Sequence, residues 1–121
     1  MAHKKVLSVG QCGYDDSQLA ALVKAAGGKL ERAADAEEAH EKLARGGYAL
    51  VLVNRVFDAD GGSGVEFIGS SRKVGITAAL MLVSDYADAQ KAAVAKGAVR
   101  GFGKSQLGEA GVVEAMREAM G

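Results

Sequence analysis

Five short apolar runs divide the sequence, and a segment with helical spacing of apolar residues follows each of them. Runs of this length and composition predict buried strands, whereas the longer segments between them predict helices. Parallel strands need a crossover connection that is usually a helix. The alternation therefore predicts an α/β fold with helices on both faces of a parallel sheet. The expected strands are residues 5–9, 29–33, 49–53, 78–83 and 99–102.

Polar capping residues and glycines predict where each helix begins and ends. Asp35, with Glu38 three residues later, is typical of a capping box. Ser63 is expected to cap the third helix, and Ser84 or Asp85 the fourth. The first helix is expected to start at residues 15–17 and the fifth at residues 108–109.

Length and composition limit the class of protein. A chain of 121 residues predicts one domain over residues 1–121. Fifteen basic and fifteen acidic residues give zero net charge, and the basic residues are scattered, which argues against nucleic-acid and acidic-membrane partners. No apolar run approaches the roughly 18 residues of a membrane span, and the first is too short for a signal peptide. We therefore expect a cytoplasmic protein.

The run Leu50-Val51-Leu52-Val53 is followed at once by Asn54, so a polar amide stands where the most strand-like segment surfaces. In open α/β sheets, ligands bind at the carboxyl ends of strands, where the strand order reverses. For a sheet ordered 2-1-3-4-5, that place lies between the first and third strands. The residues expected there are Gly10, Gln11, Cys12, Asn54, Ser84, Asp85, Gly103, Lys104 and Ser105.

The order and spacing of the predicted strands, helices and polar strand ends, over nearly the whole chain, resemble those of a response-regulator receiver domain of the CheY-like type. The stretches that carry the resemblance are ADAEEAHEKLARGGYALVLVNR, GVEFI, AALMLVSDYAD and KGAVRGFGKS, after a first strand ending at Gly10. The resemblance implies a flavodoxin-like (βα)5 fold, a doubly wound parallel sheet in the order 2-1-3-4-5. It also implies a role in two-component signal transduction.

Receivers keep an acidic pair after the first strand, a phosphoacceptor Asp after the third, a hydroxyl after the fourth and a Lys after the fifth. Carried over to this sequence, the acidic pair falls on Gly10 and Gln11, and the phosphoacceptor on Asn54. The hydroxyl and the lysine are retained as Ser84 and Lys104. The sequence departs from the pattern again near Lys104, because Ser105 replaces the usual proline and Gly101 stands where an aromatic residue is expected.

Phosphotransfer chemistry needs the carboxylates that are missing. An acyl phosphate forms on an ionised carboxylate, which the neutral amide of Asn54 cannot supply. Mg²⁺ binds hard oxygen ligands that usually include one or two carboxylates, and Gly10, Gln11 and Asn54 provide none. The sequence therefore predicts a degenerate pseudo-receiver that is not an enzyme and has no cofactor. In it, Lys104 is expected to donate hydrogen bonds to Asn54 and to backbone carbonyls.

In receivers, partners usually bind the face formed by the fourth helix, fifth strand and fifth helix, which here are residues 85–96, 99–102 and 109–120. The resemblance therefore implies docking to signalling proteins or homodimerisation through this face. The candidate contact residues are Tyr86, Lys91 and Phe102.

Three other interpretations of single motifs stay open. Asp58 and Asp60 are candidates for a metal loop, although the EF-hand spacing fails and a solvated turn is favoured. Cys12, the single cysteine, stands before the first helix, where a thiolate is stabilised, and is a candidate redox residue. The glycine-rich turn at residues 10–13 could bind a small anion. A second functional hypothesis is a small-ligand, metal or redox sensor that uses the pocket around Gln11, Asn54, Ser84 and Lys104 at the strand ends.

Overall fold

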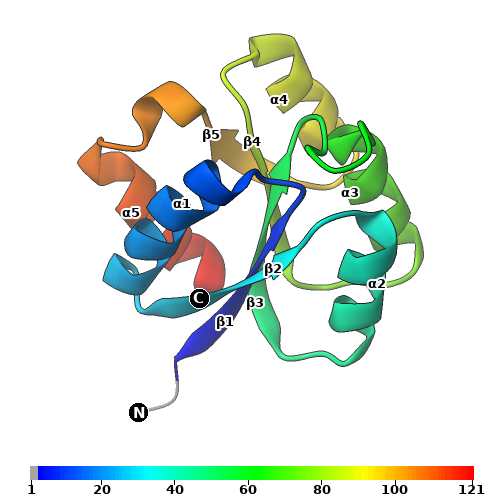
Figure 1. Cartoon of the computed structure of the whole chain (residues 1–121), viewed down its shortest axis with the longest axis horizontal. Helices are drawn as coiled ribbons and strands as arrows, with labels where there is room; N and C mark the ends of the chain where they lie inside the picture. The colour runs from blue at the N-terminus through cyan, green and yellow to red at the C-terminus, as the bar shows by residue number, and fades with distance from the viewer. Residues whose placement is uncertain (1–2) are drawn as a thin grey trace.

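The computed structural model describes residues 3–121, which form five parallel strands and five α-helices in strict alternation. The strand order is β2-β1-β3-β4-β5, so the expected flavodoxin-like arrangement is confirmed (Figure 1). A short 3₁₀ helix, η1 (Lys104–Gln106), follows β5. The strands are β1 (Lys4–Val9), β2 (Gly28–Ala33), β3 (Tyr48–Asn54), β4 (Ala79–Val83) and β5 (Val99–Phe102). The helices are α1 (Gly13–Ala25), α2 (Ala36–Ala44), α3 (Gly64–Lys73), α4 (Ala87–Ala95) and α5 (Ala110–Met120).

The middle strand β3 contributes side chains to the core on both faces of the sheet, because alternate side chains of a strand point to opposite faces. Val51 and Val53 pack with the residues of α2, α3 and α4. Leu50 and Leu52 pack on the other face with the residues of α1 and α5. This period of two explains why the run is apolar at every position, as strands buried on both faces are. Figure 1 shows the same division of helices between the two sides of the sheet.

The helix starts agree with the sequence in part. Asp35 caps α2 by accepting a hydrogen bond from the Glu38 amide at 2.9 Å, and Ser63 caps α3 in the same way through Glu66. The expected starts of α1 and α4 are wrong. The capping residue of α1 is Cys12, and α4 begins after Tyr86 without a side-chain cap.

The Gln90 side chain of α4 forms hydrogen bonds to the sheet edge made by β4 and β5. The Gln90 amide nitrogen donates to the Leu82 and Ser84 carbonyls at 2.9 and 3.0 Å, and its oxygen accepts from the Gly101 amide at 3.3 Å. The register between β4 and β5 shifts in this region, between Met81 and Val83. Gln90 therefore supplies polar contacts that an unbroken backbone ladder would otherwise supply.

Within residues 3–121, no helix has both the length and the apolar character that crossing a membrane would require.

Candidate functional site

The Gly10 carbonyl stands at the centre of the strand ends. It accepts a hydrogen bond from the side-chain nitrogen of Asn54 and another from the Asp58 amide, each at 2.9 Å. One oxygen therefore joins the end of β1, the end of β3 and the loop after β3. Asn54 acts here as a buried hydrogen-bond donor, a role that an ionised aspartate could not fill.

The loop after β3 is closed by backbone hydrogen bonds and by one aromatic ring. The Phe57 amide donates to the Gly62 carbonyl, and the Phe57 carbonyl accepts from Gly61, each at 2.8 Å. The Phe57 ring is buried and lies against Gly10, where an added Cβ would come within 2.2 Å of a ring carbon. Gly10 also has a φ of 76°, a left-handed conformation that favours glycine. A side chain at position 10, acidic or not, is therefore disfavoured by both the ring contact and the backbone conformation.

Lys104 donates its hydrogen bond to Asp15 and not to Asn54, so the predicted hydrogen bond between Lys104 and Asn54 is wrong. Its ammonium lies 2.7 Å from a carboxylate oxygen of Asp15 in the first turn of α1. The sequence placed Asp15 only as a capping residue. The ion pair could not be predicted from spacing because the partners are 89 residues apart.

Asn54 and Ser84 face one hollow at the strand ends, here called the Asn54 hollow. Its rim carries Arg55, whose guanidinium lies 4.4 Å from the centre of the Tyr86 ring. The Ser84 hydroxyl accepts a hydrogen bond from the Tyr86 amide at 3.1 Å. The lining residues are Asn54, Arg55, Val56, Val83, Ser84, Asp85, Tyr86 and Lys104.

Gln11 and Cys12 face a different hollow, here called the Gln11 hollow, on the other side of the β1 end. The structure therefore divides the single expected pocket into two. The Cys12 thiol is half-buried and accepts a long hydrogen bond of 3.5 Å from the Asp15 amide. The lining residues are Gln11, Cys12, Gly13, Arg32, Ala34, Glu38, Asp58 and Ala59.

Asp16 forms a buried polar cluster that sequence reasoning missed. Its carboxylate accepts from the Ser8 hydroxyl on β1 and pairs with the Arg32 guanidinium on β2. Ser8 could have indicated this cluster from the sequence, because a serine inside an otherwise apolar strand is buried and needs a hydrogen-bond partner.

The two candidate metal residues do not converge. The Asp60 carboxylate accepts from the Gly62 amide at 2.9 Å and so stabilises a turn, whereas Asp58 lines the Gln11 hollow. Throughout the described part of the chain, residues 3–121, no three His, Cys, Asp or Glu side chains are grouped as a metal site would require.

Solved structures resemble this chain over its full described length. A response regulator from Thermotoga maritima matches with a TM-score of 0.81 and 20% identity, covering 98% of each chain. The beryllofluoride-activated NtrC4 receiver domain dimer matches with a TM-score of 0.74 and 20% identity, covering 98% of this chain and 99% of that one. NtrX from Brucella abortus matches with a TM-score of 0.78 and 19% identity, covering 99% of this chain but 28% of that one.

The chain has the fold of a response-regulator receiver domain. At these identities the likeness concerns the fold alone. No protein-family model matches the sequence, and no curated protein does. Of the positions carried over from the resemblance, Gly10 follows β1, Asn54 ends β3, Ser84 follows β4 and Lys104 follows β5.

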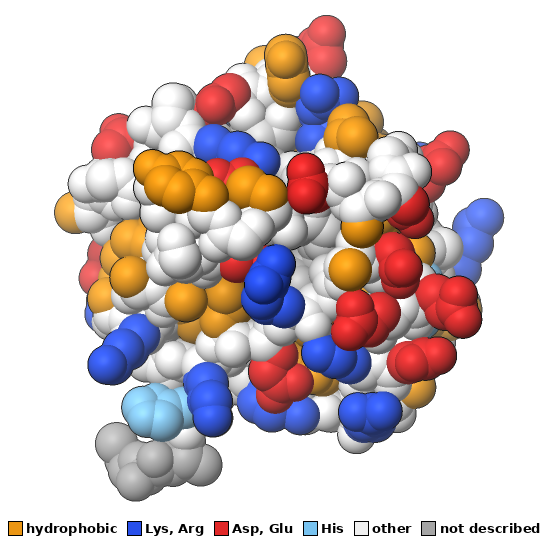
Figure 2. All heavy atoms as spheres, in the orientation of Figure 1, with side chains coloured by type: hydrophobic (Ala, Val, Ile, Leu, Met, Phe, Trp, Pro, Cys, Tyr) orange, Lys and Arg blue, Asp and Glu red, His pale blue; other side chains and the backbone are white. Residues whose placement is uncertain are grey.

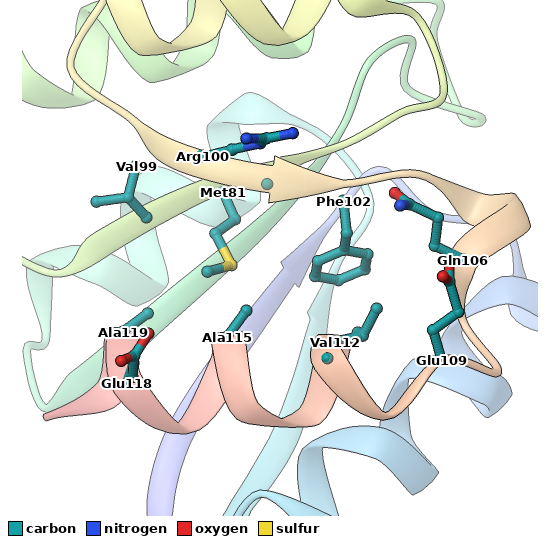
Figure 3. Close-up of a pocket in the computed structure, with 12 residues that line it drawn as sticks. Met81, Val99, Arg100, Phe102, Gln106, Glu109, Val112, Ala115, Glu118 and Ala119 are labelled. Carbon is teal, nitrogen blue, oxygen red and sulfur yellow. The ribbon is translucent and has the colours of Figure 1, made fainter.

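The receiver-fold surface around β5 holds the candidate partner residues. Tyr86 is 61% exposed and Lys91 is exposed, whereas Phe102 is buried beneath the surface at 5% and cannot itself make a broad contact. Figure 3 shows Phe102 and Met81 directed towards α5, where Val112 meets them. Hollows lie on both sides of β5, one bordered by α5 and one by α4.

Proposed function

We propose that the chain is a signalling domain that works through protein–protein contacts and does not depend on phosphorylation. The supporting observation is the hydrogen bond from Asn54 to the Gly10 carbonyl, because it occupies the place where receiver chemistry needs ionised carboxylates. The receiver fold of the solved structures supports the signalling role.

The nearest carboxylates are already engaged. Asp15 pairs with Lys104, and Asp85 accepts a hydrogen bond of 2.6 Å from the Ser105 hydroxyl. Both carboxylates are held by partners within the fold, and neither stands at position 10, 11 or 54. We infer that they do not replace the missing acidic pair, and we propose that the chain is not an enzyme.

The expected docking surface is the β5 face, defined here by α4, β5 and α5. It exposes the apolar residues Val94 and Val99, at 47% and 43%, beside the exposed cation Arg100. Exposed Glu109 and Glu118 on the α5 side bring the opposite charge. A surface with both apolar residues and charges of both signs can pair with another protein or with a second copy of itself. A matching solved structure is a receiver domain dimer.

Phosphotransfer is tested by incubating the protein with acetyl phosphate and Mg²⁺ and recording its intact mass. We expect no phosphoryl adduct, since Asn54 offers no nucleophilic carboxylate. An active receiver treated in parallel serves as the positive control. An adduct that maps to any residue of the Asn54 hollow would refute the proposal.

Docking is tested with a photo-crosslinking residue placed at Val94 in the cell of origin. Glu41, exposed on α2 beside β2 at the sheet edge opposite β5, is the control position. We expect a discrete crosslinked protein, or a crosslinked dimer, from position 94 and not from position 41. Equal crosslinking at both positions would place the contact elsewhere.

A second candidate function is small-ligand binding at the strand ends. One observation favours it: both polar atoms of the buried Gln11 side chain lack a hydrogen-bond partner among the described residues.

A further inference from the structure

Gln11 is 5% exposed, and neither its amide nitrogen nor its amide oxygen is paired with any group in residues 3–121. Buried polar side chains in proteins are almost always hydrogen-bonded, so an unpaired amide marks a place where a further polar group belongs. Gln11 also lines the Gln11 hollow, whose volume is about 340 Å³. Volumes of roughly 300–1,000 Å³ are usual for small-molecule sites.

Groups of both signs surround this hollow. Gly13 begins α1, and an added Cβ there would meet open space, so the positive end of a 13-residue helix is accessible. The Arg32 guanidinium uses one nitrogen for Asp16 and keeps the rest of its donors. The negative side consists of Glu38, at the start of α2, and Asp58, in the loop after β3. Figure 2 shows acidic side chains gathered over α2 on this face.

We infer that the Gln11 hollow binds a small zwitterion of the α-amino acid class. The inference rests on the second candidate function, small-ligand binding. An α-amino acid carries an ammonium and a carboxylate on one carbon atom, and a single primary amide offers a donor and an acceptor side by side. The Gln11 nitrogen donates to the carboxylate, while its oxygen accepts from the ammonium.

The surrounding charges agree with this orientation. The carboxylate lies towards Arg32 and the α1 terminus, where an anion is stabilised. The ammonium lies towards Glu38 and Asp58. A simple anion would meet the two carboxylates, and a simple cation would meet the guanidinium, so a zwitterion fits better than either.

Entry to the site requires a rim side chain to move, because the polar atoms of Gln11 are covered. The Glu38 side chain is 45% exposed and turns outward once it releases the Ala34 amide and Lys42, whereas Arg32 stays paired with Asp16. Cys12 lines the same hollow and is the only cysteine of the chain, which makes its thiol a specific reporter of occupancy.

The experiment measures how fast iodoacetamide alkylates Cys12, by intact mass, with each of the common L-amino acids except cysteine, whose thiol would consume the reagent, present at millimolar concentration. Alanine is compared with propionate and with ethylamine, which carry only one of its two charged groups. We expect at least one amino acid to slow alkylation about threefold or more, and the matched acid and amine to have no such effect.

Two variants test whether the protection of Cys12 from alkylation depends on the side-chain amide of Gln11. Gln11→Met removes the unpaired polar group, so it should raise the melting temperature of the free protein and abolish protection. Gln18→Met, on the half-buried side of α1, is the matched control and should keep protection. Protection that persists in Gln11→Met would overturn the site.

The outcomes also separate the inference from the function on which it rests. Equal protection by propionate or ethylamine would overturn the zwitterion and leave small-ligand binding standing. Unchanged alkylation with every compound, together with no gain in stability for Gln11→Met, would overturn both. The docking proposal uses the β5 face and is decided by its own crosslinking test.

Discussion

At the end of β3, the Asn54 side chain donates a hydrogen bond that an aspartate at the same place could not donate. The acceptor, the Gly10 carbonyl, also accepts from the backbone amide of Asp58. The Asn54 side chain is therefore one of the links between β1, β3 and the loop after β3. Asn54 is thus a structural residue in its own right, at the position onto which the resemblance to receivers carries the phosphoacceptor.

Asn54→Asp should therefore lower the free energy of unfolding. The ionised carboxylate would face the Gly10 carbonyl oxygen where a donor had stood, a loss of about 1–3 kcal/mol. Urea unfolding at neutral pH measures the change. Asp58→Asn, an exchange of the same size at an exposed neighbour, should stay within about 0.5 kcal/mol of the wild type. A stability of Asn54→Asp equal to or above the wild type would contradict the structural role.

Tyr48 gives a pH-dependent prediction. Burial first, and then the hydrogen bond of 2.7 Å to the Glu31 carboxylate, raise the pKa of Tyr48 from 10.0 to about 12. Because the folded-state pKa lies above the unfolded value, the stabilisation is complete below pH 10 and is lost as the pH rises towards 12. Ultraviolet absorbance of phenolate should show a step near pH 12 that is missing in Tyr48→Phe. A titration identical in both proteins would refute the assignment.

At the scale of elements, the sequence predicts the strands well because burial on both faces leaves β4 and residues 49–53 of β3 apolar at every position. It predicts the caps of α2 and α3 because a local side chain makes the bond. The starts of α1 and α4 are missed because Cys12 is a rare cap and Tyr86 makes no side-chain bond. Local patterns report local hydrogen bonds and nothing else.

Gln90 should contribute strongly to the β4–β5 edge. Gln90→Leu keeps the apolar stem but leaves the Leu82 and Ser84 carbonyls and the Gly101 amide without this partner. We expect a loss of about 1–3 kcal/mol in unfolding free energy and faster hydrogen exchange at the Gly101 amide. Lys91→Leu, the next residue on α4 and exposed, is the control and should change neither value greatly. Unchanged exchange at Gly101 in Gln90→Leu would argue against the bridge.

Position 10 should not accept the acidic residue that receivers carry. In Gly10→Ala, the new Cβ meets the Phe57 ring and the left-handed backbone strains the side chain. We expect a loss of about 1–3 kcal/mol in urea unfolding. Gly13→Ala, whose Cβ would meet nothing within 4 Å, is the matched control and should be far milder. A Gly10→Ala variant as stable as the wild type would contradict the steric conflict with Phe57.

At the scale of the whole molecule, the alternation of strands and helices predicts a parallel α/β sheet, and the resemblance to receivers implies the order of its strands; the structure confirms both. The site was predicted only in part. Ser84 and Asn54 face a common hollow as expected, but Lys104 turns to Asp15 and Gln11 lies in a separate hollow. These partners are distant in sequence and depend on how the loops fold over the strand ends, which no residue spacing encodes.

The central claim is that the receiver fold is kept here without its phosphate chemistry. Its most direct test is a titration of the ¹⁵N-labelled protein with Mg²⁺ and beryllofluoride, a mimic of the phosphorylated aspartate, followed by NMR. With no carboxylate at Gly10, Gln11 or Asn54, we predict no saturable chemical-shift change at Asn54, Ser84 or Lys104. Saturable shifts at these residues would show a working phosphoryl site and contradict the claim.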